Sequence, residues 1–294
     1  SLHDALPISV YILKADGGTV DLVSALKRPV ETILSGPAAS YIGITALFPR
    51  IEGDAILVDI GGTSTDIFFL AAGLPLFEAE GIEIDGRKTL VRAVFSKSVG
   101  LGGDSLVRVD GDDIRIGPSR QGPAVAFGGD DLTPTDALVY LGLMRGKYPQ
   151  KAEEALAVFA AELGLETEVC ARKIVALFCS SIMQTIYSIL ERINSSPVYT
   201  IRDLLAGRRI IPGSIKLIGG PAKALAEALH EASGLEVDFP ENYEIANALG
   251  AALARPTTEI SLYANTERRI LSIPELDIYE TIDKSFNLAE AEKI

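Results

Sequence analysis

The chain has 294 residues, of which 48% are hydrophobic and 23% charged, which is enough for one large globular domain or two moderate ones. Its formal net charge of −13 excludes the basic footprint of a nucleic-acid-binding protein. The acidity points to solubility rather than to a particular partner.

Both cysteines lie in one apolar stretch with helical periodicity. Cys170 and Cys179 are nine residues apart, so at about 100° per residue they face opposite sides and cannot form a bridge within one helix. The longest uncharged apolar run, 174–190, falls short of the roughly 20 apolar residues of a spanning helix, because it carries Ser180, Ser181, Gln184, Thr185 and Ser188. We therefore expect a core helix, buried thiols, no membrane contact and a cytoplasmic protein.

The first eight residues, 1–8, read like translated sequencing-adapter DNA rather than protein. We expect the native sequence to begin near Ser9. His230 is then the one native histidine, and we expect it at the surface, which leaves little room for histidine-based catalysis.

Residues 11–30 predict a strand, a turn at 16–18 and a short helix. The next segment, 32–43, predicts a second helix with Ser35 as its N-cap and Pro37 in its first turn. The small residues Ala38, Ala39 and Gly43 form one face of that helix, which allows close approach to another backbone.

Residues 54–70 predict two buried strands joined by a tight turn. Each strand is a short apolar run, and the turn between them combines glycines with hydroxyl residues. Bare backbone N–H groups and hydroxyls are the chemistry of a phosphate cradle, and an aspartate at a strand end suits a metal-bound water. A plain glycine hairpin is the alternative. The candidate residues are Asp59, Gly61, Gly62, Thr63, Ser64, Thr65 and Asp66.

Residues 74–84 predict a third strand, and residues 85–212 then interrupt the sheet with a mixed α+β insertion. The insertion contains a glycine loop at 99–105, a hairpin over 106–116 and helices at about 133–143, 149–163 and 167–194. The glycine loop lines a substrate or phosphate site or is purely structural; its candidate residues are Gly102, Gly103, Asp104 and Ser105. Three acidic residues of the hairpin, Asp110, Asp112 and Asp113, read as a solvated turn, and Thr135 and Asp136 as helix caps.

The sheet resumes with a strand at 214–218, followed by a helix to about residue 233, a strand at 236–239 and a helix at 243–254 with a second face of small residues. Between the first strand and helix, Gly219, Gly220 and Pro221 leave the backbone bare, so a flat ring or a ribose could lie against it. An ordinary strand–helix turn is the alternative. Neither a dinucleotide fingerprint nor a P-loop spacing occurs in the sequence.

The order of these elements resembles the actin, sugar-kinase and heat-shock-chaperone ATPase superfamily, in which two ribonuclease-H-like lobes clasp ATP. The resemblance implies that 34–43 and 245–253 are the two connecting helices. It also makes Asp59 to Asp66 the phosphate motif of the second lobe, and Gly219, Gly220 and Pro221 the adenosine motif.

Within that superfamily, the chain resembles the hydantoinase/oxoprolinase A-type family. The matching stretches are 34–39, 58–66, 98–105, 122–124, 127–129 and 134–137. The family implies ATP-dependent opening of a cyclic amide, such as a hydantoin or 5-oxoproline, with Mg²⁺ and with phosphorylation of the amide oxygen. Asp59 and Thr63 would be catalytic, with Asp59 acting on Mg²⁺ through water. Related members are subunits of ketone carboxylases, so a carboxylase subunit and a second partner subunit in an oligomer are alternatives.

Two departures from the superfamily pattern affect this interpretation. The only Asp-x-Gly-Gly-Thr run begins at Asp59, so the matching hairpin of the first lobe is missing and we expect a fragment with weak or no turnover alone. Gly36 stands where chaperones carry a water-positioning glutamate, which makes a non-catalytic ATP-binding module the second alternative.

The expected fold is therefore α/β, a ribonuclease-H-like lobe with a large mixed α+β insertion. Residues 9–48 would end the first lobe, 49–257 would form the second, with its sheet in 54–84 and 214–257, and 258–294 would be a C-terminal extension.

Overall fold

The computed structural model describes residues 9–48, 50–78, 81–84, 87–89, 91, 93–111, 113–195, 209–257 and 260–294. The chain forms two compact units, Ser1–Arg255 and Pro256–Ile294, and each is described by itself. The segment 1–8, expected to be an adapter artefact, lies outside the described residues, as does Asp112 of the acidic turn.

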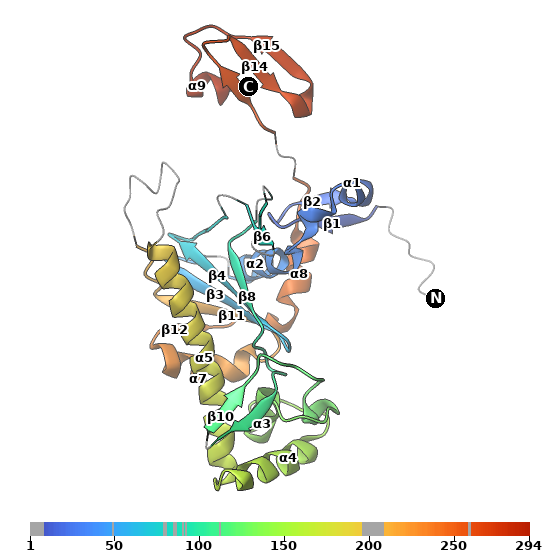
Figure 1. Cartoon of the computed structure of the whole chain (residues 1–294), viewed down its shortest axis with the longest axis vertical. Coiled ribbons are helices and arrows are strands. Elements are labelled where there is room, and N and C mark those ends of the chain that lie inside the picture. Colours follow the sequence, from blue (N-terminus) through green and yellow to red (C-terminus); the bar gives the residue numbers. More distant parts are fainter. Residues whose placement is uncertain are drawn as a thin grey trace. The chain divides into compact units, whose positions relative to one another are not determined.

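A six-stranded sheet forms the centre of the first unit (Figure 1). The hairpin of β3 (Ala55–Ile60) and β4 (Thr65–Ala71) is antiparallel, while β11 (Ser214–Ile218) runs parallel to β3 and β12 (Glu236–Asp238) parallel to β11. On its other side, β4 pairs with the short β5 (Leu74–Pro75) and with β8 (Ser96–Val99). The predicted sheet hairpin and the later strands are confirmed.

The expected third strand over 74–84 is wrong. β5 ends at Pro75, and β6 (Glu83–Ile84) pairs instead with β7 (Arg87–Lys88) in a separate two-stranded ribbon. Gly81 between them has a φ of +80°, a conformation that interrupts an extended run.

The two faces of the sheet are covered by different helices, because side chains alternate along each strand. Ala55, Leu57, Phe68 and Leu70 form one core with residues of α2 (Ser35–Leu47) and α8 (Ala246–Leu253). The opposite face carries Ile56, Val58 and Ile60, which pack with α5 (Thr167–Ser195) and α7 (Ala222–Ser233).

Helices α2 and α8 cross in close backbone contact, as their small faces predict. A Cβ added at Gly43 would lie 1.9 Å from the Ala246 carbonyl oxygen, and one at Gly250 would lie 1.9 Å from that of Ala39. The prediction that Ser35 is the N-cap of α2 is wrong, because Ser35 is the first residue of the helix. The N-cap is Leu34, which has a φ of +63° and no side-chain bond to the helix.

The insertion contains the hairpin of β9 (Val107–Asp110) and β10 (Asp113–Ile116), the short helix η2 (Val125–Phe127), and the helices α3 (Pro134–Tyr140) and α4 (Pro149–Glu162), as well as α5. Thr133 and Asp136 form the capping box of α3, so the predicted capping role of Asp136 is confirmed. By length and composition α5 could cross a bilayer, contrary to expectation, yet ten of its residues are buried, which is the packing of a core helix.

The chain ends are built from small elements. The first unit begins with the ribbon of β1 (Tyr11–Leu13) and β2 (Thr19–Asp21), then α1 (Leu22–Lys27) and η1 (Pro29–Thr32); η3 (Tyr243–Ile245) precedes α8. The second unit is an antiparallel sheet of β13 (Tyr263–Asn265), β14 (Ile270–Ile273) and β15 (Ile278–Thr281), with η4 (Pro274–Leu276) and α9 (Leu288–Ala291).

Candidate functional site

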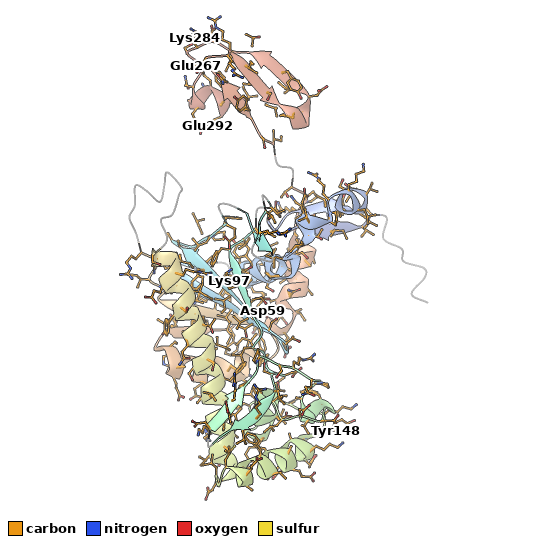
Figure 2. All side chains as sticks on the ribbon, viewed as in Figure 1. Asp59, Lys97, Tyr148, Glu267, Lys284 and Glu292 are labelled. Carbon is orange, nitrogen blue, oxygen red and sulfur yellow. The ribbon has the colours of Figure 1, made fainter. Side chains whose placement is uncertain are left out.

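The β3–β4 hairpin ends in a tight turn that the Gly61 N–H closes with a 2.9 Å hydrogen bond to the Ser64 carbonyl. The strand register pairs Asp59 with Asp66 just below that turn. Alternation along the strands turns both aspartates toward the face covered by α2 and α8, on which side Asp59 lies in Figure 2. Two carboxylates therefore stand together beneath an exposed glycine turn.

The turn presents a row of unpaired backbone donors. Among the residues that the structure describes, no acceptor forms a hydrogen bond with the N–H groups of Gly62, Thr63 or Ser64. Gly62 and Thr63 are exposed, and Ser64 is half-buried. Successive free N–H groups in a turn form a concavity that binds anions, so this geometry suits a phosphate group.

The glycine loop of the insertion packs directly onto the turn. Gly103 N donates to the Gly61 carbonyl at 2.9 Å and Asp104 N donates to the Gly62 carbonyl at 2.7 Å. A Cβ at Gly102 would lie 2.5 Å from the Gly62 carbonyl oxygen, so this position needs a glycine. The loop occupies the carbonyl side of the turn and leaves its N–H groups free.

Two of the candidate hydroxyls are already used in holding this loop. The buried Thr65 hydroxyl donates to the Leu101 carbonyl at 2.6 Å, and the buried Ser105 hydroxyl accepts from Gly102 N at 2.9 Å. Because a hydroxyl has a single proton to donate, Thr65 has none left for a phosphate. Thr63 and Ser64 carry the hydroxyls that are accessible at the turn.

Asp59 is held by the two crossing helices. Ser40 of α2 donates its hydroxyl proton to Asp59 Oδ2 at 2.6 Å, and Asn247 of α8 donates through Nδ2 to Ser40 Oγ at 2.8 Å and to the Gly36 carbonyl at 3.1 Å. Sequence reasoning missed both Ser40 and Asn247. The one sequence feature that pointed toward these two residues is that each lies on a helix with a small-residue face.

Burial dominates the electrostatics of the aspartate pair. It raises the pKa of Asp59; the Ser40 hydrogen bond opposes this, and the charge of Asp66 raises the pKa further. Burial also raises the pKa of Asp66, and a hydrogen bond with the Ser98 hydroxyl on the neighbouring strand partly opposes this rise. Asp66 Oδ1 is buried without a hydrogen-bond partner in the described part of the chain, which is a position that a cation or its water would satisfy.

The second glycine turn lies beside the first. Ile218 at the end of β11 pairs with Asp59, and Gly219 follows with a φ of +97°. A Cβ at Gly219 would lie 2.2 Å from the Ile60 carbonyl oxygen and 2.7 Å from Asp59 Oδ1. The buried Pro221 is the N-cap of α7, and Gly220 stays exposed. The fold therefore brings the predicted phosphate and adenosine turns together.

The two carboxylates suit a magnesium ion that also binds water and phosphate better than they suit a metal ion held by protein side chains alone. Within the described ranges, no group of three or more His, Cys, Asp or Glu side chains could hold a metal ion. Mg²⁺ is commonly bound by one or two carboxylates together with waters and substrate phosphates. Asp59 and Asp66 are two carboxylates that would fit this pattern, next to the turn at residues 61–64.

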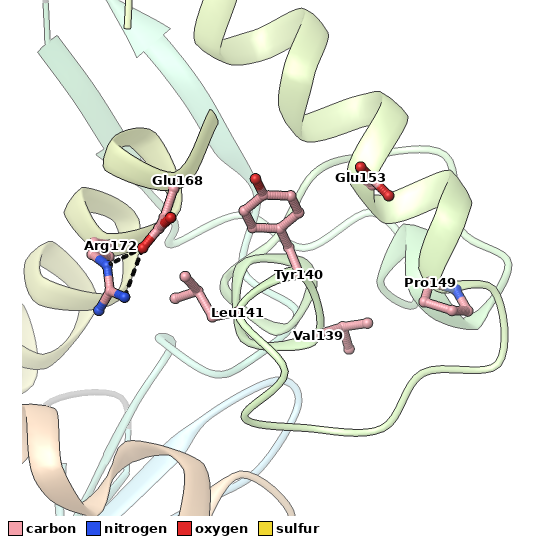
Figure 3. Close-up of a pocket in the computed structure, with 7 residues that line it drawn as sticks. All are labelled: Val139, Tyr140, Leu141, Pro149, Glu153, Glu168 and Arg172. Atoms are coloured by element: carbon pink, nitrogen blue, oxygen red, sulfur yellow. Dashed lines mark hydrogen bonds and ion pairs between the residues drawn. The ribbon is translucent and has the colours of Figure 1, made fainter. Parts of the chain in front are cut away.

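A cavity of about 420 Å³ lies elsewhere, in the insertion (Figure 3). Glu168 and Arg172 form an ion pair at 2.8 Å on one side of it, and Tyr140 and Glu153 line it from α3 and α4. Neither glycine turn contributes to its wall, so the cavity is separate from the candidate site.

The strand order, the crossing helices and the paired glycine turns define an actin-like ATPase lobe of the ribonuclease-H type. Two solved structures share this fold. A nucleotide-free ATP-dependent acetone carboxylase matches with a TM-score of 0.67 at 23% identity, over 87% of this chain and 36% of its own. The ATP-dependent caprolactamase of Pseudomonas jessenii matches with a TM-score of 0.64 at 24% identity, over 90% of this chain and 40% of its own. The predicted fold class is confirmed.

Within this class the chain belongs to the hydantoinase/oxoprolinase family, whose model matches residues 2–260, so the predicted family is confirmed. Protein MJ0964 of Methanocaldococcus jannaschii is 27% identical over 266 residues, covering 83% of this chain and 38% of its own. The γ subunit of acetophenone carboxylase from Aromatoleum aromaticum is 33% identical over 171 residues, covering 51% of this chain and 23% of its own. The chain thus spans at most about two-fifths of the length of these relatives.

Proposed function

We propose that the turn at residues 61–64 binds the phosphates of ATP, and that the chain is the nucleotide-binding lobe of an enzyme that activates its substrate by phosphorylation. The observation that carries this proposal is the row of free N–H groups at Gly62, Thr63 and Ser64 beside the Asp59–Asp66 pair. Catalysis of phosphoryl transfer rests mainly on positioning and charge neutralisation, which such a turn supplies.

Each part of the site has one role in this proposal. Gly62, Thr63 and Ser64 hold phosphate oxygens, while Gly219, Gly220 and Pro221 form the surface for the adenosine. Gly61, also predicted to bind phosphate, instead closes the turn, because its N–H is bonded to the Ser64 carbonyl. Asp59 and Asp66 would hold a magnesium ion through its water, with Ser40 holding Asp59 in place. A bound magnesium ion would neutralise charge on the phosphates.

We propose a cyclic amide, of the hydantoin or 5-oxoproline type, as the substrate. Phosphorylation of the amide oxygen would turn a poor electrophile into a carbon that water attacks. Family membership supports this choice, as does the fold shared with an enzyme named as an ATP-dependent caprolactamase, since a caprolactam is a cyclic amide.

A subunit of an ATP-dependent ketone carboxylase is the second candidate. The 33% identity to the γ subunit of acetophenone carboxylase favours it, and it would bring a partner subunit and an oligomer. The same phosphate site would serve both reactions. Co-purification of a second, larger subunit with the protein would favour the carboxylase.

We also propose that the protein works in the cytoplasm. Both cysteines are free and fully buried, and burial raises the pKa of Cys179 to about 12, so its thiol stays protonated and inert. Buried unpaired thiols suit a reducing compartment.

Phosphate release from ATP tests the proposal, using the full-length product of the encoding gene and a panel of hydantoins, lactams and ketones with bicarbonate. Stimulation by a ring amide supports the hydrolase, and stimulation by a ketone with bicarbonate supports the carboxylase. ATP binding without turnover on any of them would favour the non-catalytic module, which Gly36 makes credible. No binding of ATP would contradict the proposal as a whole.

A further inference from the structure

Arg120 brings a permanent positive charge to the edge of the phosphate turn. Its Nη2 lies 3.1 Å from Oδ2 of Asp104. The same carboxylate oxygen lies 2.7 Å from the point that a Cβ at Gly62 would occupy. Because both distances end at Asp104 Oδ2, the distance from the Arg120 guanidinium to that point at Gly62 cannot exceed their sum.

The position of Asp104 is unfavourable for an anion site unless its charge is balanced. Its backbone N–H is bonded to the Gly62 carbonyl at 2.7 Å, which fixes the residue beside the turn. A carboxylate there repels an incoming phosphate, because the like charges are only a few ångströms apart. Pairing with Arg120 offsets that repulsion.

The ion pair is not needed to hold the loop in place. Backbone bonds from Gly103 and Asp104 to the turn already fix one side, and Leu106 N donates to the Ser119 carbonyl at 2.9 Å next to Arg120. The two side chains keep 38% and 18% of their surface exposed, and ion pairs open to water contribute little to stability. Such a pair exchanges readily for a better ligand.

We propose that Arg120 is the phosphoryl-binding side chain of this site, and that Asp104 is its counter-ion when no nucleotide is bound. On binding, the guanidinium leaves Asp104 for the oxygens of the terminal phosphoryl group of ATP. The planar fork of an arginine matches the geometry of a phosphate and stays charged at every working pH. This inference rests on the proposed function, since it takes ATP as the ligand.

Binding affinities for ATP and for adenosine test this role, measured calorimetrically at one salt concentration on the full-length gene product. Arg120→Gln should weaken ATP binding about tenfold or more, since it removes a charge-assisted contact, and should leave adenosine binding unchanged. Asp104→Asn should bind ATP at least as tightly as the wild type, since a competing carboxylate is gone.

Arg115→Gln is the matched control. Arg115 also pairs with an aspartate, Asp110, at 3.3 Å on the neighbouring hairpin, so the variant removes the same charge from the same insertion. It should bind ATP within about twofold of the wild type, because the screened long-range field of one exposed charge is weak.

The outcomes separate this inference from the function on which it rests. A wild type that binds no ATP overturns both. Normal ATP binding by Arg120→Gln, with the wild type and Arg115→Gln also binding, overturns the inference alone. Equal losses of ATP and adenosine binding in Arg120→Gln would make the residue structural and would also overturn it, as would weaker ATP binding by Asp104→Asn.

Discussion

The Ser40 hydroxyl lies 2.6 Å from Oδ2 of Asp59 and donates a hydrogen bond to it. This contact joins the first of two crossing helices to the end of the strand that leads into the turn at residues 61–64. Ser40 also accepts a hydrogen bond from Asn247 on the second helix. The orientation of Asp59 is therefore tied to the crossing of α2 and α8.

We expect Ser40→Ala to lower the rate of ATP hydrolysis about tenfold, because a hydrogen bond to a charged group contributes about 1.5–3 kcal/mol. The loss should fall mainly on kcat, since the backbone groups proposed to bind the phosphates are untouched. Steady-state kinetics on the full-length gene product measure both constants. Ser180→Ala is the control, as that hydroxyl bonds to the Ala176 carbonyl of its own helix. Equal kinetics in both variants would show that Ser40 does not position Asp59.

The two threonines of the hairpin should separate binding from stability. Thr63→Val removes an exposed hydroxyl and should weaken ATP binding several-fold while leaving the melting temperature unchanged. Thr65→Val removes a buried bond to the Leu101 carbonyl and should cost about 1–3 kcal/mol of stability. Calorimetric titration and thermal unfolding give the two readouts. A loss of stability in Thr63→Val together with weaker ATP binding in Thr65→Val would contradict the roles assigned to the two residues.

The crossing of α2 and α8 should tolerate no side chain at its glycines. Gly43→Ala and Gly250→Ala each place a Cβ 1.9 Å from a backbone oxygen, so each should destabilise the fold by about 1–3 kcal/mol or more. Gly36→Ala, in the same helix, meets nothing within 4 Å and should be neutral or slightly stabilising. Chemical denaturation measures all three. Equal stability across the series would contradict the close crossing.

The buried carboxylate of Asp66 should make stability fall as the pH rises. Burial raises its pKa above the ordinary 3.8, so the folded state keeps the proton to a higher pH than the unfolded chain does. The stabilisation from that proton is complete below about pH 3.8 and is lost as the pH rises through the folded-state pKa. Asp66→Asn should therefore be more stable than the wild type at neutral pH, with the difference shrinking as the pH falls.

Denaturant unfolding at a series of pH values measures that difference. Asp110→Asn, at an exposed aspartate on the β9–β10 hairpin, serves as the control and should track the wild type. A difference between Asp66→Asn and the wild type that grows toward acid would have the opposite sign and would contradict a raised pKa.

Features set by neighbours in the chain could be predicted from the sequence. The glycine pair, the hydroxyls and the flanking apolar runs predict the β3–β4 hairpin, because strand patterning and turn chemistry are local. The small faces of α2 and α8 predict close approach to another backbone, which the Gly43 and Gly250 positions confirm.

Side-chain hydrogen bonds and ion pairs between distant parts of the chain could not be predicted. Ser40 and Asn247 are 207 residues apart, and Arg120 reaches Asp104 only because the insertion folds back on the turn. Thr65 was predicted, like Thr63, to bind the nucleotide, yet strand alternation buries its hydroxyl against the loop. Such roles depend on tertiary packing, on which one sequence gives no direct information.

Asp59→Asn in the phosphate-release assay tests the central claim most directly. The full-length gene product is compared with the variant, each with the ring amide or ketone that best stimulates the wild type. The account predicts a loss of about 10²–10³-fold in substrate-stimulated hydrolysis, as for other preorganised groups that stabilise a transition state, with a melting temperature no lower than that of the wild type. Substrate-stimulated hydrolysis at the wild-type rate in a folded Asp59→Asn protein would contradict it.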